Sequence, residues 1–282
     1  ADVLGEADLV KEVARIATLT KLQGKTLRRV LTGVPKPILS RAKKREQAAQ
    51  RAGAALGFHE CVSYSFIDQA AAALFGAGSD ATRLENPISA DMSHMRPDLL
   101  PGLLAAAQRN QARGFADLAL FEIGPVFSGG EPEEQDLQSA GLLIGRSAPK
   151  DVHASDRDVD LFDAKADALS ILGAIGAPAK TQIRRGAAPW WHPGRHGQIC
   201  LGPKKTLAVF GELHPKILAA FDIKGPAVGF TIWPNEVPLP RNSLPTRPAL
   251  KLKDLQAVER DFACVVDHKT EAMDLANAAQ GA

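Results

Sequence analysis

The chain has 282 residues, of which 45% are hydrophobic and 23% are charged, and it carries a formal net charge of +2 at pH 7. A chain of this length and apolar content can bury one large core or two smaller ones, so we expect a globular protein. The net charge is too small to indicate a nucleic-acid partner by itself, although charge can be uneven along the chain.

The three cysteines, Cys61, Cys200 and Cys264, lie far apart in the sequence. Their odd number and wide spacing indicate neither a disulfide framework nor a zinc knuckle, which fits a reducing cytosol. No apolar run approaches the roughly 20 residues needed to cross a bilayer, and the amino terminus lacks the basic-then-apolar pattern of a signal peptide. We therefore expect a soluble, cytoplasmic protein with no membrane partner.

A short amphipathic helix is expected at the start of the chain. Four apolar residues recur there at helical spacing, namely Leu9, Val10, Val13 and Ile16. Glycine and proline punctuate residues 20–39, which is typical of a connector between two units.

A second helix is expected after this connector. Ser40 is a good helix cap, and Gly57 is a plausible stop for a helix that runs to about Leu56. The apolar residues that follow predict a strand over residues 61–66.

Residues 95–127 predict a helix followed by a buried strand. Asp98 can cap the helix, and its first turn tolerates Pro101 because the first backbone N–H groups have no intrahelical partner. An apolar stripe is formed by Leu100, Leu103, Leu104 and Ala107, with Gly114 as the stop. Residues 118–123 are apolar on both faces apart from Glu122, which favours a central strand. Gly124 and Pro125 are expected to interrupt this strand, and Gly129 with Gly130 to form a turn before an acidic segment.

The remaining elements continue as strands with a helix between them. Further strands are expected at residues 140–144, 198–201, 207–213 and 228–233. A helix is expected at residues 162–175, with its apolar stripe on Ala166, Leu169, Leu172 and Ile175. Strands with interspersed helices imply an α+β fold.

Several separated motifs resemble the beta chain of bacterial phenylalanyl-tRNA synthetase. In chain order they are GEADLVKEVARI (5–16), GFHECVSYSF (57–66), ENPIS (85–89), MRPDLLPGLL (95–104), LALFEIGPVF (118–127), FDAK (162–165), HPGR (192–195), GELHP (211–215) and ERDFACVVD (259–267). One such motif would be weak evidence, but nine motifs in the family's order over nearly the whole chain are a specific signal. The resemblance implies a class II aminoacyl-tRNA synthetase-like antiparallel sheet flanked by helices.

The resemblance also implies a domain organisation. It assigns residues 1–20 to the end of a B5-like domain, 21–39 to a connector and 40–240 to a catalytic-like class II core module. Residues 241–282 would be a linker and the start of a ferredoxin-like anticodon-binding domain, with its opening strand in RDFACVVD. Both ends fall inside domains, so we expect a fragment excised from a longer chain. Residues 40–66 resemble class II motif 1, the element used for subunit association.

The residues that perform class II chemistry are missing from the expected positions. Motif 2 should end in an arginine and an acid that hold the ATP phosphates and the amino-acid ligand, but alignment places Ser128 and Gly130 there. A hydroxyl cannot replace a guanidinium that neutralises phosphate charge. Motif 3 has only a near miss at Gly76, Gly78 and Arg83, which we interpret as a loop. We therefore predict no catalytic residues and no ATP binding by this chain.

Asp2, Asp8 and Glu12 are the candidate Mg²⁺ ligands. Asp8 and Glu12 lie four residues apart on one helix face, and oxygen ligands suit Mg²⁺, although a solvated acidic face is much the commoner explanation of this spacing alone. The family's magnesium site, shared with the alpha chain, uses two Asp and two adjacent Glu. Lys11 stands where the first Glu is expected, so the site is weakened or lost in this chain.

The basic cluster Arg41, Lys43, Lys44 and Arg45 is the candidate contact for RNA or another subunit. Cations at the start of a helix oppose the positive end of its dipole, so a partner would compensate them. A solvated, screened charge run is the commoner explanation for such a cluster.

The segment at residues 187–197 offers two weaker possibilities, a His192/His196 metal pair and base stacking by Trp190 and Trp191. Glycine and proline prevent the helix that would align the two histidines, and no basic pattern surrounds the tryptophans. We expect a structural role for this segment, and a turn or core role for His214.

The resemblance thus implies an architectural role in an alpha-beta heterotetramer. Its alpha chain would activate phenylalanine with ATP and esterify tRNA(Phe), while this module scaffolds the alpha chain and assists tRNA binding. Two alternatives stay open: an active class II ligase with atypical residues, and a freestanding RNA-binding module that uses the basic cluster.

Overall fold

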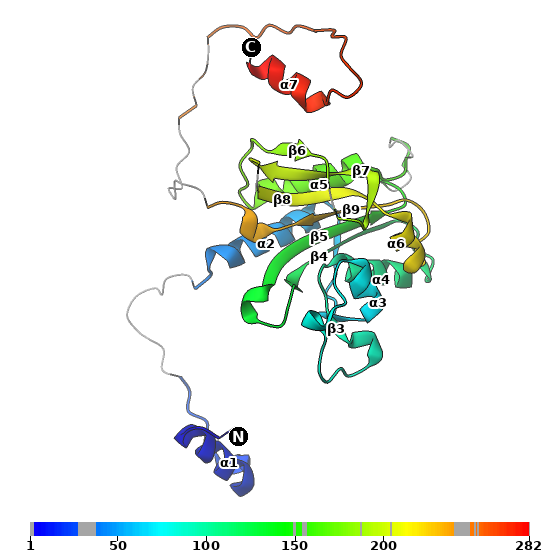
Figure 1. The fold of residues 1–282 in the computed structure, drawn as a ribbon. Helices are drawn as coiled ribbons and strands as arrows, with labels where there is room; N and C mark the ends of the chain where they lie inside the picture. The colour runs from blue at the N-terminus through cyan, green and yellow to red at the C-terminus, as the bar shows by residue number, and fades with distance from the viewer. Residues whose placement is uncertain are drawn as a thin grey trace. The chain divides into compact units, whose positions relative to one another are not determined.

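The structure is a computed structural model of the chain, and it describes residues 3–27, 38–148, 151–153, 157–186, 188–203, 205–239, 249–250, 252 and 254–281. Contacts divide the chain into two compact units, Ala1–Leu39 and Ser40–Ala282 (Figure 1). Their assignment to named domains stays a prediction.

The first unit contains the amphipathic helix that the sequence predicts, α1 (Glu6–Ala17), followed by a 3-10 turn at Leu19–Lys21. The Asp8 carboxylate accepts hydrogen bonds from the backbone N–H groups of Leu4 (3.1 Å) and Gly5 (3.0 Å), and thereby fixes the start of the helix. No residue of α1 is buried, so its apolar stripe is uncovered in the described part of this unit.

The second unit is built on a seven-stranded sheet with the order β1-β4-β5-β9-β8-β7-β6. The strands are β1 (His59–Glu60), β4 (Leu118–Phe127), β5 (Gln135–Ile144), β6 (Gln182–Arg184), β7 (Trp191–Leu201), β8 (Lys205–Leu213) and β9 (Ala227–Ile232). All neighbouring pairs are antiparallel except β1 with β4, which confirms the predicted α+β class. A separate two-stranded ladder joins β2 (Phe66–Ile67) to β3 (His94–Met95).

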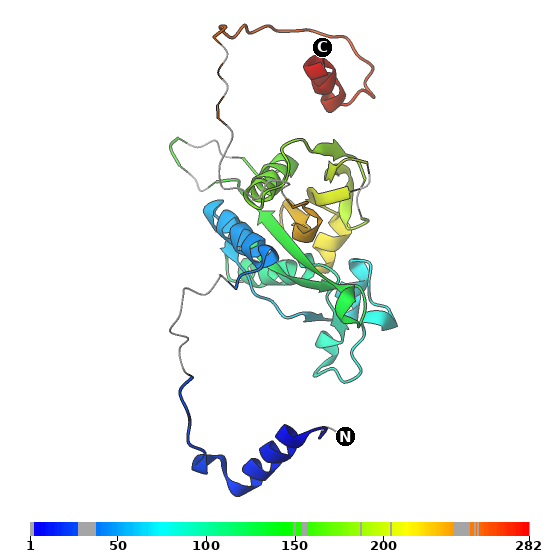
Figure 2. The ribbon, with the colours of Figure 1, turned by 90° about the vertical axis from the view of Figure 1, so that its left-hand side faces the viewer.

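Helices cover both faces of this sheet (Figures 1 and 2). On one face, α2 (Arg41–Ala55) and α5 (Leu161–Ala174) lie against each other and bury a core that includes Phe121 and Phe230. On the other face, α4 (Leu100–Gln111) buries its leucines against Leu120 and Leu142. Leu120 and Phe121 are adjacent in β4 yet belong to different cores, as the alternation of side chains in a strand requires.

Shorter helical segments complete the second unit. They are α3 (Gln69–Leu74), α6 (Pro215–Ala220) and α7 (Ala272–Gly281), with 3-10 turns at Asp80–Thr82, Ala90–Met92, Pro132–Glu134 and Pro234–Glu236. None of the helices in the part of the chain that the structure describes is long and apolar enough to span a bilayer. The three cysteines are free, as the sequence predicts.

Two helices begin and end close to where the sequence predicts, although the N-cap position of α4 is Leu99 and this helix ends at Gln111, before Gly114. The Ser40 hydroxyl accepts a hydrogen bond from the Lys43 N–H (3.1 Å) at the start of α2, and Gly57 follows its end with a φ of +92°. The Asp98 carboxylate accepts from the Leu100 N–H (2.8 Å) at the start of α4, and the predicted stripe on this helix is fully buried.

The prediction that Gly124 and Pro125 interrupt the strand is wrong, because β4 continues to Phe127 in register with β5. The neighbouring odd-numbered residues direct their backbone groups away from β5: the Phe121 carbonyl accepts from Cys61 and the Phe127 N–H donates to Arg96. The Pro125 nitrogen therefore faces the side where the ladder with β5 needs no donor, so proline is tolerated there.

Three other expectations need correction. The strand expected over residues 61–66 is replaced by the short strands β1 and β2 on either side, with no ladder at 61–65. On α5, the buried stripe is Ala164, Ala168, Ile171 and Leu172, whereas the predicted Ala166 and Leu169 are exposed, because the helix is apolar on more than one face. Residues 256–266 form neither helix nor strand, so the expected strand in RDFACVVD is absent from the described residues.

Candidate functional site

The hairpin between β4 and β5 carries the positions where the motif 2 residues were expected. The Ser128 N–H and hydroxyl both donate to the Glu134 carbonyl, at 2.8 and 3.1 Å. The Glu134 carboxylate in turn accepts from the Glu131 N–H at 3.0 Å. These bonds close a tight loop, so the Ser128 hydroxyl is already used to hold the hairpin.

A hollow of about 370 Å³ lies beside this hairpin. Three carboxylates line it, from Glu133, Glu134 and Asp136, together with the Trp233 ring. Among the described residues that line it there is no lysine, arginine or histidine. A nucleotide carries several negative charges on its phosphates, so an acidic lining without a cation repels it.

The near miss to motif 3 is a helix-ending turn. Gly76 and Gly78 follow α3 with φ values of +81° and +91°, and a Cβ on Gly78 would lie 3.1 Å from the Ala73 backbone. Arg83 is exposed and pairs with Asp80 at 3.7 Å, and it does not line the hollow. The structure therefore agrees with the interpretation of this stretch as a loop.

A buried ion pair holds the backbone around β4 in place. The Arg96 guanidinium lies 2.6 Å from the Glu122 carboxylate, and their side chains are only 3% and 4% exposed. Arg96 also donates to the Pro125 carbonyl (2.9 Å) and to the Ser63 hydroxyl (3.0 Å), while Ser63 donates to Glu122 at 2.6 Å. The pair thus ties the segment after β1 to the entry of α4 and to β4.

The sequence alone indicated one member of this ion pair. Glu122 is the one charged residue in a strand that is otherwise apolar on both faces, and buried charges require partners. Its partner Arg96 was not predicted, because the two residues lie on different elements. Gly102 and Gly124 leave room for the network, since a Cβ on Gly124 would lie 2.6 Å from the Arg96 guanidinium.

A second buried carboxyl lies next to this ion pair. Asp98 accepts from the Leu100 N–H and from the Gln138 amide (3.1 Å), and Gln138 accepts from the Leu99 N–H at 2.8 Å. Burial raises the pKa of Asp98 to about 6, although these hydrogen bonds oppose the shift. The carboxyl therefore helps to hold the start of α4, and burial keeps its pKa above the ordinary value.

The two candidate magnesium ligands that the structure describes, Asp8 and Glu12, both have partners within the chain. Asp2 lies outside the described residues, Asp8 accepts from two backbone N–H groups, and Glu12 pairs with Arg15 at 2.8 Å. Lys11 also reaches Glu12, at 3.9 Å. Within the described ranges no group of three or more metal-ligating side chains comes together.

Two of the four residues of the basic cluster have partners within the chain. Arg45 donates to the carbonyls of Val237 and Pro238, both at 2.6 Å, and is half-buried, so its guanidinium binds the chain itself. Lys43 pairs with Glu46 at 2.6 Å. The side chains of Arg41 and Lys44 are exposed and make no hydrogen bond or ion pair with any residue that the structure describes, which leaves them available to a partner.

The histidines and tryptophans of residues 187–197 are held by the fold. His196 donates through Nδ1 to the His192 carbonyl (2.6 Å), and the His192 ring accepts from the Gly194 N–H. Trp191 is buried, and the Trp190 ring packs on Phe75 with centroids 5.4 Å apart. These contacts favour the predicted structural role.

His214 also has a structural position. It precedes α6, and its ring accepts a hydrogen bond from the Lys216 N–H at 3.1 Å, so it caps this short helix. This agrees with its predicted turn role.

Comparison with known proteins identifies a family profile and close relatives. The profile described as the phenylalanyl tRNA synthetase beta chain CLM domain matches residues 29–233. The phenylalanine–tRNA ligase beta subunit of Ruegeria pomeroyi is 70% identical over 281 residues, and that of Rhodospirillum rubrum is 46% identical over 283 residues. Each alignment covers 100% of this chain but 35% of the relative, so the chain spans about a third of their length.

Solved structures agree on the fold. A pyrrolysyl tRNA synthetase from Desulfitobacterium hafniense superposes with a TM-score of 0.52, covering 69% of this chain and 64% of its own at 17% identity. At this identity the likeness supports the class II synthetase-like fold and no further property.

Proposed function

Because the chain belongs to the phenylalanyl-tRNA synthetase beta-chain family, we propose that it is the non-catalytic core module of a phenylalanine–tRNA ligase beta subunit. In this proposal the alpha chain of a heterotetramer activates phenylalanine with ATP and esterifies tRNA(Phe). The present module holds the alpha chain in place. The observation that carries the proposal is the acidic hollow beside the β4–β5 hairpin, where a nucleotide site would need cations.

The charge of this hollow works strongly against ATP. Two unit charges 4 Å apart interact by about 4 kcal/mol near a protein surface, and with like signs this energy opposes binding. Glu133, Glu134 and Asp136 would each oppose the phosphates. Ser128 occupies the position aligned with the motif 2 arginine, and its hydroxyl donates to the Glu134 carbonyl. This arrangement supports assigning nucleotide chemistry to another chain.

The segment after β1 supports a scaffolding role. Ser63 is anchored inward by its hydrogen bond to Glu122, and exposure alternates around it, with Cys61 and Ser65 partly buried. Val62 and Tyr64 are accordingly 93% and 73% exposed. Two large apolar side chains fixed on the surface by a buried ion pair suit a subunit interface, because an isolated monomer gains nothing from exposing them.

Copurification with a phenylalanyl alpha chain tests this proposal. We expect immobilised alpha chain to retain the chain, and the double variant Val62→Ser/Tyr64→Ser to bind about tenfold more weakly or worse because it loses apolar contact area. Val152→Ser is the matched control, since Val152 is also exposed and apolar but lies elsewhere in the sequence. No retention, or equal retention of both variants with unchanged melting temperatures, would reject the proposed interface.

We also propose contact with tRNA, because the exposed side chains of Arg41 and Lys44 pair with none of the residues that the structure describes. In a salt titration of tRNA(Phe) binding to the assembled ligase, neutralising both residues should lower affinity at low salt. It should also reduce the slope of log K against log salt by about 1 for each lost phosphate contact. An unchanged affinity and slope would leave only the scaffolding role.

The magnesium assignment remains part of the proposal. Asp8 and Glu12 offer carboxylates on one face of α1, with Asp2 before it, and the alpha chain would have to supply further ligands. Glu12 would also have to leave its ion pair with Arg15. Calorimetric titration of Mg²⁺ into the assembled ligase should therefore give weak binding that Asp8→Asn abolishes, whereas equal binding by the variant rejects these ligands.

A further inference from the structure

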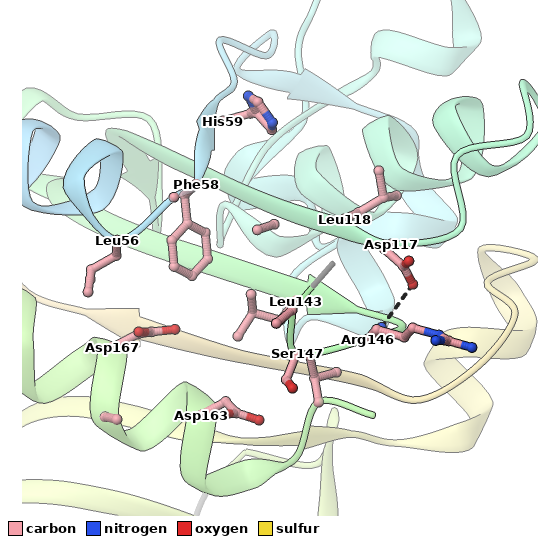
Figure 3. A pocket seen from close by; sticks show the side chains of 15 residues that line it. Leu56, Phe58, His59, Asp117, Leu118, Leu143, Arg146, Ser147, Asp163 and Asp167 are labelled. Atoms are coloured by element: carbon pink, nitrogen blue, oxygen red, sulfur yellow. Dashed lines mark hydrogen bonds between the residues drawn. The ribbon is translucent and has the colours of Figure 1, made fainter. Parts of the chain in front are cut away.

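A larger cavity, of about 560 Å³, lies at the opposite end of β4 from the hairpin (Figure 3). Four segments line it: the turn after α2, the start of β4, the residues from the end of β5 onward and the first turns of α5. A volume of this size is typical of a site for a small organic molecule or one side chain. The proposed scaffolding function makes no use of it.

The floor of the cavity is apolar and well fixed. Phe58, Leu118, Leu143 and Val159 contribute to it. The Phe58 ring packs edge-on against two other buried rings, with centroid distances of 6.3 and 5.8 Å to Phe121 and Phe230. A rigid apolar floor favours a ligand with an apolar body, because little conformational freedom is lost on binding.

Two carboxylates of α5 line the cavity, and they differ in their partners. Asp163 is paired with Arg157 through two hydrogen bonds of 2.7 Å and also accepts from the Asp160 N–H. Asp167, one turn further along, is half-buried and has no hydrogen bond or ion pair with the residues that the structure describes. Burial and the nearby Asp163 raise its pKa to about 6. Among the described parts of the chain, Asp167 is thus a carboxylate without a counter-ion.

The other polar groups of the lining do not supply that counter-ion. Asp117 accepts from the Arg146 N–H at 2.9 Å, and Figure 3 shows both residues at the other end of the cavity from Asp167. His59 is exposed at the rim. The carboxylates outnumber the guanidinium, so an anionic ligand is disfavoured, and no metal-ligating group of three is present among the described residues.

We propose that this cavity binds an organic cation, an ammonium or guanidinium on an apolar body, with Asp167 as its counter-ion and Phe58 and Leu143 against the body. A neutral apolar ligand would leave the Asp167 carboxylate desolvated and unpaired, which costs free energy. A cation instead pairs with a carboxylate that has no counter-ion among the residues that the structure describes. The cation can belong to a free amine or to a lysine side chain of a partner.

The binding test uses phenethylamine and its neutral counterpart 2-phenylethanol, titrated into the chain and followed by NMR of the backbone amides. We expect the amine to shift the amides of Phe58 and Leu143 and to bind about tenfold more tightly than the alcohol, because only the amine pairs with Asp167. Equal affinities, or shifts elsewhere on the molecule, would overturn the proposal.

Variants distinguish the contribution of the Asp167 carboxylate from that of the cavity volume. Asp167→Asn should weaken amine binding about tenfold, whereas Asp91→Asn, which removes the same charge at an exposed position outside the lining, should not. Ala166→Phe, which fills the cavity and keeps the charge, should also abolish binding. Wild-type affinity in either cavity variant, with an unchanged melting temperature, contradicts the assignment.

A second binding experiment identifies the source of the cation. A short apolar peptide with a central lysine is compared with the same peptide acetylated on that lysine. Tighter binding of the unmodified peptide identifies a partner's lysine, and binding of phenethylamine alone identifies a small molecule. Failure of both the peptide and the amine overturns the proposal and leaves the scaffolding function untouched.

Discussion

Removing the Glu122 carboxylate while keeping Arg96 tests how β4 and the entry of α4 are held together. Breaking a buried ion pair by deleting one partner costs about 3–5 kcal/mol, because the other charge remains buried and unpaired. Here Arg96 keeps hydrogen bonds to the Pro125 carbonyl and the Ser63 hydroxyl. We therefore expect Glu122→Ala to cost about 3 kcal/mol, the lower end of that range, out of a total of about 5–15 kcal/mol.

Urea unfolding, followed by circular dichroism and extrapolated to water, measures this cost. Glu212→Ala is the matched control, because Glu212 pairs with Arg195 at the same 2.6 Å but with side chains 25% and 51% exposed. A partly exposed pair contributes less than a buried one, and exposed pairs contribute about 1 kcal/mol or less. If Glu122→Ala destabilises the chain no more than Glu212→Ala does, the buried pair does not stabilise β4 and the reasoning is refuted.

Three further predictions concern stability. The folded pKa of Asp98, about 6, lies above its ordinary value of 3.8. The protonated form of Asp98 therefore stabilises the folded state fully at low pH, and about 3 kcal/mol of unfolding free energy is lost as pH rises from about 4 to 6. The variant Asp98→Asn should remove this pH dependence of the unfolding free energy. Gly141→Ala should cost about 1–3 kcal/mol in urea unfolding, because a buried phenylalanine ring packs directly over this glycine. Gly173→Ala, in open space on α5, should instead stabilise by up to about 1 kcal/mol, and equal effects would contradict the packing argument. Arg45→Ala should lower the melting temperature, because it leaves backbone carbonyls without their donors, whereas Lys44→Ala should leave it unchanged; the reverse order would refute the division of the basic cluster.

The sequence predicted local structure well wherever local chemistry determines it. Ser40 and Asp98 begin their helices because each side chain bonds a backbone N–H group only a few residues away. The predicted α4 residues are buried, but Pro101, Gly102 and Ala106 between them are buried too, so the first two turns of this helix are covered on more than one face. On α5 both faces carry apolar residues, so periodicity alone could not say which face meets the sheet.

Features that depend on distant contacts were not predictable from the sequence. The continuation of β4 through Pro125 depends on whether the Pro125 nitrogen points toward β5 or away from it. The register of the two strands decides this, and not the identity of the residue. Glu122 was visible as an exception, but its partner Arg96 is identified only by the fold. The cavity around Asp167 assembles from four separate segments, so no motif marks it.

The most direct test of the central claim is ATP–pyrophosphate exchange by the purified chain in the presence of phenylalanine and Mg²⁺. Because carboxylates line the hollow where a nucleotide would need cations, the account predicts no exchange above background from the chain alone. It predicts exchange when a phenylalanyl alpha chain is added. Phenylalanine-dependent exchange that follows the chain alone through successive purification steps would contradict the claim that catalysis resides in the other subunit.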